Sequence, residues 1–211
     1  MAKSRDPFLM SLERIRQRAR GGGYVSGRPI VIVDEARYLG VSTTPVREAL
    51  SWLCGEGLVE RGPSGGFLAT RLDAAAVRDR YGLRLICLLA GLDLTSGLPT
   101  QGRTPRRGED AVADLRALFD ELVGRAGNTA LLDAYDRVEG QLLEFTPPER
   151  RLFEDVDREA EDVLAVAGRD DNGELRTVLR RYHQRRIEAS AILALDLARD
   201  HELPGLEAGD P

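Results

Sequence analysis

Apolar residues recur every three or four positions through most of the chain, which is the spacing of one buried helix face. β-branched runs are short and lie in the amino-terminal third. The periodicity predicts helices over these ranges: residues 7–20, 35–39, 43–55, 74–94, 110–124, 129–144, 148–167 and 172–198. The fold class expected from this pattern is therefore mostly α.

The first three predicted helices are bounded by residues that start or stop helices. Gly21–Gly23 ends the first, and Asp34 is placed to cap the second, directly after the β-branched run Ile30–Val33. That run is long enough for a strand or an extended arm. We expect the Ser42 hydroxyl to cap the third helix, where Pro45 in the first turn loses no intrahelical hydrogen bond.

The third helix has an apolar and a polar face. Its apolar stripe, spaced at i, i+3, i+4 and i+7, consists of Val46, Ala49, Leu50 and Leu53. The opposite face carries Thr43, Thr44, Arg47, Glu48 and Ser51. After this helix, Leu58–Arg61 and Phe67–Arg71 flank the turn sequence Gly62-Pro63-Ser64-Gly65-Gly66, which predicts a small β-hairpin. Helix, short turn, helix and hairpin together form a winged helix-turn-helix.

From residue 73 onward the pattern predicts an antiparallel bundle of about five or six helices. Residues 95–109 indicate an exposed loop, and Thr146-Pro147-Pro148 is expected to separate two helices. The end of the chain from His201 is expected to be frayed. We therefore predict a winged domain at 1–72, a helical domain at 73–198 and a flexible tail at 199–211.

Charge is distributed unevenly along the 211 residues. The formal net charge is −5, but residues 1–72 carry +4 and the remainder −9. A basic amino-terminal part favours contact with a polyanion there. No run approaches the roughly 18 apolar residues of a membrane span, and the amino-terminal region lacks the apolar stretch of a signal peptide. We expect a cytoplasmic protein that does not contact membranes.

The residues argue against an enzyme and against a metal site. Cys54 and Cys87 are the only cysteines and both lie in apolar patterns, which indicates reduced core thiols. The sequence has no Gly-x-Ser-x-Gly motif, no phosphate-binding loop, no Gly-x-Gly-x-x-Gly after a strand and no histidine beside a serine or cysteine. We expect no catalytic residues, no cofactor and no bound metal.

Residues 36–50 read ARYLGVSTTPVREAL, and residues 55–61 read GEGLVER. In order and spacing they resemble the GntR family of bacterial transcription regulators, whose recognition helix follows a Leu-Gly-Val-Ser turn and precedes a wing. The bundle beginning with Tyr81-Gly82-Leu83-Arg84 is similar to the FadR-like subgroup. The resemblance implies a carboxy-terminal domain that binds effectors and dimerises. It also implies a regulator, expected to be a repressor, that binds a pseudo-palindromic operator in double-stranded DNA as a homodimer.

The candidate DNA-binding residues lie at the start of the recognition helix, along its polar face and on the wing: Ser42, Thr43, Thr44, Arg47, Ser51, Arg61, Gly65 and Gly66. Arg47 is the strongest candidate for contact with DNA, because a guanidinium bonds bidentately to guanine O6 and N7 or clamps a phosphate. The alternative is that Arg47 pairs with Glu48 or Glu56 on a solvated face. The wing glycines let backbone approach the neighbouring groove, and Arg61 or Arg71 can neutralise phosphates.

Two positions depart from the family pattern. Thr43 stands where many members have arginine, and Ser64-Gly65 stands where the wing tip is often Asn-Arg. Each lost phosphate contact lowers the salt dependence by about one unit of slope, so we expect modest affinity or an unusual operator. Arginines elsewhere could compensate, although a solvated face is the leading interpretation for them: Arg14, Arg16, Arg18, Arg20, Arg103, Arg106 and Arg107.

The resemblance also implies an effector site inside the bundle. Many FadR-like members hold a divalent metal with one aspartate and three histidines, and that metal anchors a carboxylate effector. Here Asp136 matches the aspartate, Gly140 stands where a histidine is expected, and Glu159 and His183 match the other positions. We interpret this as a degenerate metal site. Arg84 matches an inward arginine that could pair with a small carboxylate effector, or form a salt bridge instead.

Two other classes of function stand beside the DNA-binding regulator. One keeps the fold without sensing: an effector-independent dimeric DNA-binding or protein-interaction module with a degenerate ligand site. The other is an enzyme that uses carboxylates such as Glu139 and Glu144, or the acidic run 154–162. A solvated helix face explains those carboxylates better.

Overall fold

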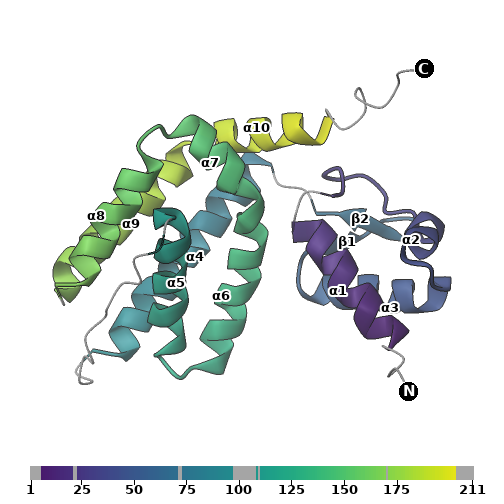
Figure 1. Ribbon diagram of the computed structural model, residues 1–211, viewed down its shortest axis with the longest axis horizontal. Coiled ribbons are helices and arrows are strands. Elements are labelled where there is room, and N and C mark those ends of the chain that lie inside the picture. Colours follow the sequence, from purple (N-terminus) through teal and green to yellow (C-terminus); the bar gives the residue numbers. More distant parts are fainter. Residues whose placement is uncertain are drawn as a thin grey trace. The chain divides into compact units, whose positions relative to one another are not determined.

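The computed structural model describes residues 6–20, 23–70, 73–96, 108, 110–169 and 171–202. They are mostly helical (Figure 1). The elements are α1 (Pro7–Arg20), α2 (Ile32–Leu39), α3 (Thr43–Gly55), β1 (Val59–Arg61), β2 (Phe67–Ala69), α4 (Ala74–Leu94), α5 (Ala111–Gly124), α6 (Thr129–Leu142), the 3₁₀-helix η1 (Leu143–Phe145), α7 (Thr146–Leu152), α8 (Val156–Ala167), α9 (Asn172–Glu188) and α10 (Ser190–Glu202). Contacts divide the chain into two units, Met1–Asp73 with Ala194–Pro211, and Ala74–Leu193.

The first unit contains the winged helix-turn-helix. Both α1 and α2 pack against α3, and β1 follows α3 into the wing. The fully buried members of its core are Ile15, Val46, Ala49, Leu50 and Leu53. The antiparallel hairpin pairs Val59 with Ala69, Glu60 with Leu68 and Arg61 with Phe67. The helices predicted over 7–20 and 43–55, the hairpin and the fold class are confirmed.

Two local predictions in this unit are wrong. α2 begins at Ile32, inside the β-branched run, so Asp34 lies in its first turn and is not the cap. The backbone N–H of Ile30 instead donates to the carbonyl of Phe67 at 2.8 Å, which ties the start of that run to the wing. Ser42 does occupy the N-cap position of α3, but its hydroxyl makes no capping hydrogen bond.

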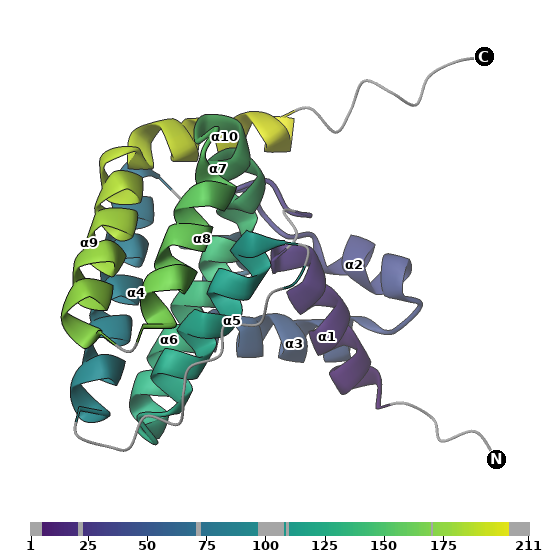
Figure 2. The same ribbon diagram turned by 60° about the vertical axis from the view of Figure 1, so that its left-hand side comes forward.

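The second unit is a helical bundle around α4. This helix packs against α5, α6 and α9, and α8 packs against α5 and α9, as Figures 1 and 2 show. The fully buried aliphatic members of its core include Leu88, Leu92, Val123, Ala160, Leu175 and Leu179. Gly91 allows α4 to approach α5 closely, because a Cβ there would lie 2.5 Å from the carbonyl oxygen of Leu122.

Two of the predicted helices in the bundle are each divided into two. The range 148–167 contains α7 and α8, separated by Phe153–Asp155. The range 172–198 contains α9 and α10, which meet at Ala189. The predicted separator Thr146-Pro147-Pro148 is instead the first turn of α7, where proline removes no intrahelical donor.

Some sequence predictions fall outside the described residues. These are Gly21 and Gly22, Arg71, most of the loop 95–109 with its three arginines, and the tail from residue 203. Residues 199–202, predicted as part of the tail, belong to α10. In the described part of the chain, every helix is too short or too polar to cross a membrane.

Candidate nucleic-acid interface

The helix α3 turns its apolar stripe into the core and its polar residues to solvent. Val46, Ala49, Leu50 and Leu53 are completely buried. The predicted reading residues on this segment are all exposed: Ser42, Thr43, Thr44, Arg47 and Ser51. The structure therefore brings them together on one face that a DNA groove could meet.

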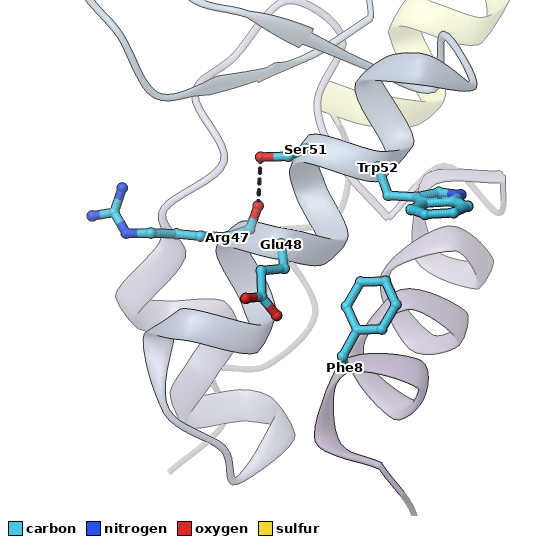
Figure 3. Close-up of a pocket in the computed structure, with 5 residues that line it drawn as sticks. All are labelled: Phe8, Arg47, Glu48, Ser51 and Trp52. Carbon is cyan, nitrogen blue, oxygen red and sulfur yellow. Dashed lines mark hydrogen bonds between the residues drawn. The ribbon is translucent and has the colours of Figure 1, made fainter.

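Arg47 extends away from the body of the helix (Figure 3). Within the described residues no ion pair engages its guanidinium. Glu56, one of the two acids considered for it, is held by Arg16, whose Nε and Nη2 lie 3.0 and 2.6 Å from its carboxylate oxygens. The only hydrogen bond drawn at Arg47 is at its backbone carbonyl, which accepts from the Ser51 hydroxyl at 2.8 Å. The Arg47 charge is thus available to a ligand.

The wing is joined to this face through Arg61. Its Nη2 donates to the Ser51 hydroxyl at 3.1 Å, and its guanidinium carbon lies 4.7 Å from the centroid of the Phe67 ring. Gly65 and Gly66 form the turn with φ values of 86° and 78°, which side chains other than glycine rarely adopt. Both glycines are exposed, so the wing presents bare backbone at its tip.

The arginine Arg18 of α1 serves the fold. Its Nη1 lies 2.8 and 3.0 Å from the two carboxylate oxygens of Glu35, a buried residue of α2. Its guanidinium stacks on the rings of Tyr24 and Tyr38, and the Tyr24 hydroxyl donates to Glu35 at 2.9 Å. Burial, reinforced by the Glu35 charge, raises the pKa of Tyr24 far above its usual value. This arginine is therefore occupied in joining α1 to α2.

The sequence pattern does not predict a hollow that the structure shows beside Arg47. It has a volume of about 570 Å³ and is lined by Phe8, Arg47, Glu48, Ser51 and Trp52 (Figure 3). Trp52 is 58 % exposed, and its ring meets that of Phe8 edge-on with centroids 6.1 Å apart. The exposure of Trp52 could have been predicted from its position outside the buried apolar stripe of α3.

Two of the predicted effector-site residues, Arg84 and His183, contact each other in the bundle. Arg84 is 3 % exposed, its Nε donates to His183 Nε2 at 3.1 Å and its Nη1 donates to Glu139 at 3.0 Å. The other ring nitrogen of His183 lies 2.7 Å from the Leu179 carbonyl, which places the ring proton there. Burial, and then the charge of Arg84, lower the pKa of His183 well below its usual value. The imidazole is therefore neutral.

A second buried arginine, which sequence reasoning missed, lies on α9. Arg186 Nε donates to Glu149 at 2.8 Å, and its Nη1 donates to Glu159 at 2.9 Å. The Tyr81 hydroxyl donates to the other oxygen of Glu149. Among the described residues, three buried polar atoms lack a hydrogen-bond partner: Nη2 of Arg84, Nη2 of Arg186 and Oε1 of Glu139. The burial of Arg186 could have been predicted from its i, i+4 spacing with Tyr182, which places both on the inner face of α9.

These residues do not fit a divalent metal. Asp136 is exposed, whereas the inward carboxylate of α6 is Glu139, which is paired with a guanidinium. Both nitrogens of His183 are engaged, and two arginine charges lie among the acids. No group of three or more metal-ligating side chains occurs in the described residues. In the described part of the bundle, the buried positive charges are those of Arg84 and Arg186.

Comparison with known proteins supports the same fold. No family model matches the chain. The structure of McbR/YncC from E. coli is similar with a TM-score of 0.60 and 17 % identity, over 90 % of this chain and 98 % of that one. A GntR family transcriptional regulator from Pseudomonas syringae pv. tomato gives a TM-score of 0.46 and 19 % identity, over 93 % of this chain and 89 % of that one.

A curated relative from Streptomyces ambofaciens is described as an uncharacterized HTH-type transcriptional regulator in an unstable DNA locus. It is 47 % identical over 58 residues, which are 28 % of this chain and only 25 % of that protein. The description of this relative agrees with the resemblance of residues 36–61 to a family of transcription regulators.

Proposed function

We propose that this GntR-type chain is a sequence-specific DNA-binding repressor that reads a pseudo-palindromic operator as a homodimer, with α3 in the major groove. The observation that carries the proposal is the division of α3 into a buried apolar stripe and an exposed face. On that face Arg47 makes no ion pair with any residue that the structure describes. A two-fold protein doubles the contacts that one short reading helix can make.

Arg47 supplies base recognition in this proposal. Its guanidinium presents two parallel N–H groups to guanine O6 and N7, or clamps a phosphate when the base differs. The threonines Thr43 and Thr44 lie in the first turn, where they can contact a thymine methyl or donate to phosphate. Because the Ser42 hydroxyl does not cap α3, it and the first-turn N–H groups remain available to a phosphate oxygen.

The wing positions the protein on the duplex. The hydrogen bond from Arg61 to Ser51 places a second positive charge beside the reading helix. That charge can neutralise a phosphate next to the groove that α3 enters. The exposed backbone of Gly65 and Gly66 can approach the neighbouring groove without a side chain in the way. Arg61 thus contributes to affinity more than to sequence choice.

The test is a comparison of two arginine variants on genomic fragments selected by the protein itself. Arg47→Ala should weaken specific binding by about 1–3 kcal/mol and relax the choice of sequence. Arg14→Ala, at an exposed position of α1, is the matched control and should bind as the parent does. Fluorescence anisotropy over a range of salt concentrations measures both. Equal affinity of Arg47→Ala and the parent for the selected fragment would contradict the proposal.

We further propose that a small carboxylate effector binds in the bundle beside Arg84, without a metal. The specific observation is that two buried guanidinium groups, those of Arg84 and Arg186, each retain an Nη2 donor that no described residue accepts from. Buried donors without partners cost free energy that an anion could recover. Of the other predicted site residues, His183 and Glu159 contact these arginines, and Asp136 does not.

Thermal unfolding with acetate, pyruvate and citrate tests the effector proposal. A saturable rise in the unfolding temperature is expected for at least one of them, because a ligand that binds only the folded state stabilises it. Chloride at the same ionic strength is the control, and adding EDTA should change nothing. The absence of any shift would favour the alternative of an effector-independent DNA-binding or interaction module.

A further inference from the structure

The first unit leaves an aromatic pair open to solvent. Trp52 of α3 is 58 % exposed, and the half-buried Phe8 of α1 meets it edge-on with ring centroids 6.1 Å apart. Large aromatic side chains stabilise a fold mainly through the area that they bury, and this indole keeps much of its area in water. The hollow that the two rings line with Arg47, Glu48 and Ser51, here called the aromatic hollow, is therefore a candidate contact surface (Figure 3).

The aromatic hollow lies on the same exposed side of α3 as the residues proposed to read DNA. Glu48 and Trp52 are four residues apart, as are Arg47 and Ser51, so the members of each pair are neighbours on the helix surface. Figure 3 shows Arg47 leaving α3 on one side and Trp52 on the other, with Glu48 between them. The exposed surface of α3 thus has a basic edge at Arg47 and an aromatic edge at Trp52.

A helix seated in the major groove brings both of these edges to the DNA. The groove is about 12 Å wide, and a helix with its side chains is about 10–12 Å across. With Arg47 against one side of the groove, the aromatic edge lies against the other side or over the base edges beneath. The seated helix therefore removes Trp52 from bulk water.

Charge decides which part of the duplex the aromatic hollow can meet. Its rim carries the exposed carboxylate of Glu48, which forms no ion pair with the described residues, while Arg47 extends to the opposite side. This carboxylate repels a phosphate, and the aromatic rings offer a phosphate no positive charge. The base edges in the major groove are uncharged, and the methyl group of thymine is the apolar group among them.

We infer that the aromatic hollow receives the methyl-bearing edge of an operator thymine, with Trp52 as the residue that selects this base. The inference rests on the proposed binding of α3 in the major groove and names a base that the groove must present. It is distinct from the thymine contacts proposed for the first turn of α3. Thr44 lies about 12 Å along the helix axis from Trp52, at about 1.5 Å per residue.

Replacing thymine by uracil tests the contact, because it removes the methyl group and leaves the hydrogen-bonding groups of the base unchanged. Each thymine of a fragment selected by the protein is replaced in turn, and affinity is measured by fluorescence anisotropy. At one thymine in each half-site, the parent should lose about fourfold in affinity, the value of one buried methyl group. Trp52→Ala should bind the thymine and uracil forms of that position equally and respond as the parent does at every other thymine.

Two further variants separate base selection from folding. Trp52→Phe keeps an aromatic ring and should still discriminate thymine from uracil. Leu9→Ala changes a residue of α1 that is 59 % exposed but does not line the hollow, and it should discriminate as the parent does. Because the ratio of affinities compares two DNA fragments on one protein sample, a partial loss of folded protein cancels from it.

The fluorescence of Trp52 gives a second measurement that needs no variant, since it is the only tryptophan of the chain. Acrylamide quenches the emission of an indole that is open to solvent. Saturation with the selected fragment should lower the quenching constant, because the seated helix covers the ring.

Either of two results would overturn the inference: no thymine at which the parent and Trp52→Ala respond differently to uracil, or a quenching constant that bound DNA leaves unchanged. A chain that binds the selected fragment through Arg47 but gives either result would keep the proposed function and lose only the thymine contact. A chain that binds no DNA would refute both.

Discussion

Gly91 sets the distance between α4 and α5 by the absence of a side chain. A Cβ at this position would lie 2.5 Å from the Leu122 carbonyl oxygen and 3.3 Å from the Cα of Val123, both of which are backbone atoms that cannot rotate away. Gly91→Ala gains about 1 kcal/mol of helix propensity, but forcing two helices apart costs more, typically about 1–3 kcal/mol or above. We expect a lower urea midpoint. Gly124→Ala, where nothing lies within 4 Å, is the control and should not destabilise the chain.

Ser42 and Asp110 occupy the same position on two helices and should behave differently. Asp110 accepts hydrogen bonds from the N–H groups of Val112 and Ala113, whereas the Ser42 hydroxyl accepts none. Asp110→Ala should therefore cost about 1 kcal/mol of unfolding free energy, and Ser42→Ala less than about half of that. Urea titration followed by circular dichroism measures both. A Ser42→Ala cost equal to that of Asp110→Ala would show that the serine caps α3 after all.

At the scale of elements, the sequence predicts helices better than it predicts their breaks. The stripe of α3 and the long α4 follow from periodicity alone. The break between α7 and α8 falls at the buried Phe153, and that between α9 and α10 at Ala189, where no glycine or proline marks an end. Contacts between helices of the bundle determine where these breaks fall, and the helix propensity of the local sequence contains no information about those contacts. The predicted cap at Asp34 was also wrong, because α2 begins two residues earlier, at Ile32.

Of the two candidate sites, the sequence predicted the exposed face of α3 but not the buried network in the bundle. The exposure of the candidate DNA-reading side chains could be predicted because a local motif carries them, and Arg47 lies on the exposed face of α3. The interior network could not, because Glu149 and Arg186 come from separate helices and each looks solvated in the sequence. Their pairing depends on which faces of α7 and α9 turn inward. Asp136 was placed by resemblance one turn away from the carboxylate that does face inward, Glu139.

The ion pair between Arg18 and Glu35 is expected to hold α1 and α2 together. Glu35→Ala would leave the guanidinium and the Tyr24 hydroxyl without their acceptor, at a cost of about 1–3 kcal/mol. Trp52, the only tryptophan, lies in α3 and reports on unfolding of this unit by fluorescence. Disruption of the exposed pair between Arg37 and Asp34, by Asp34→Ala, is the control and should cost less than about 1 kcal/mol. Equal costs for the two variants would argue against the joining role.

At the scale of the whole molecule, the free energy of unfolding depends on pH, and two groups lower it as the solution becomes more acidic. Burial lowers the pKa of His183, so stability is complete above its unfolded pKa and is lost as pH falls below it, where only the unfolded chain takes up the proton. The hydrogen bond from Arg185 lowers the pKa of Asp155, which adds stability that is lost at more acidic pH. Both groups therefore weaken the fold on acidification.

Glu144, in η1, acts in the other direction. Burial raises its pKa to about 8, and the nearby Arg80 only partly opposes this shift. Since the folded pKa lies above the unfolded value of 4.5, stability is complete below 4.5 and is lost as pH rises toward 8. Glu144→Gln should remove this loss, so that its unfolding temperature exceeds the parent's at pH 8.5 by more than at pH 5. Glu161→Gln, at an exposed position of α8, is the control and should show no such trend. The melts are compared at one protein concentration, because any association of copies would also shift the unfolding temperature. A constant difference between Glu144→Gln and the parent across this pH range would refute the assignment.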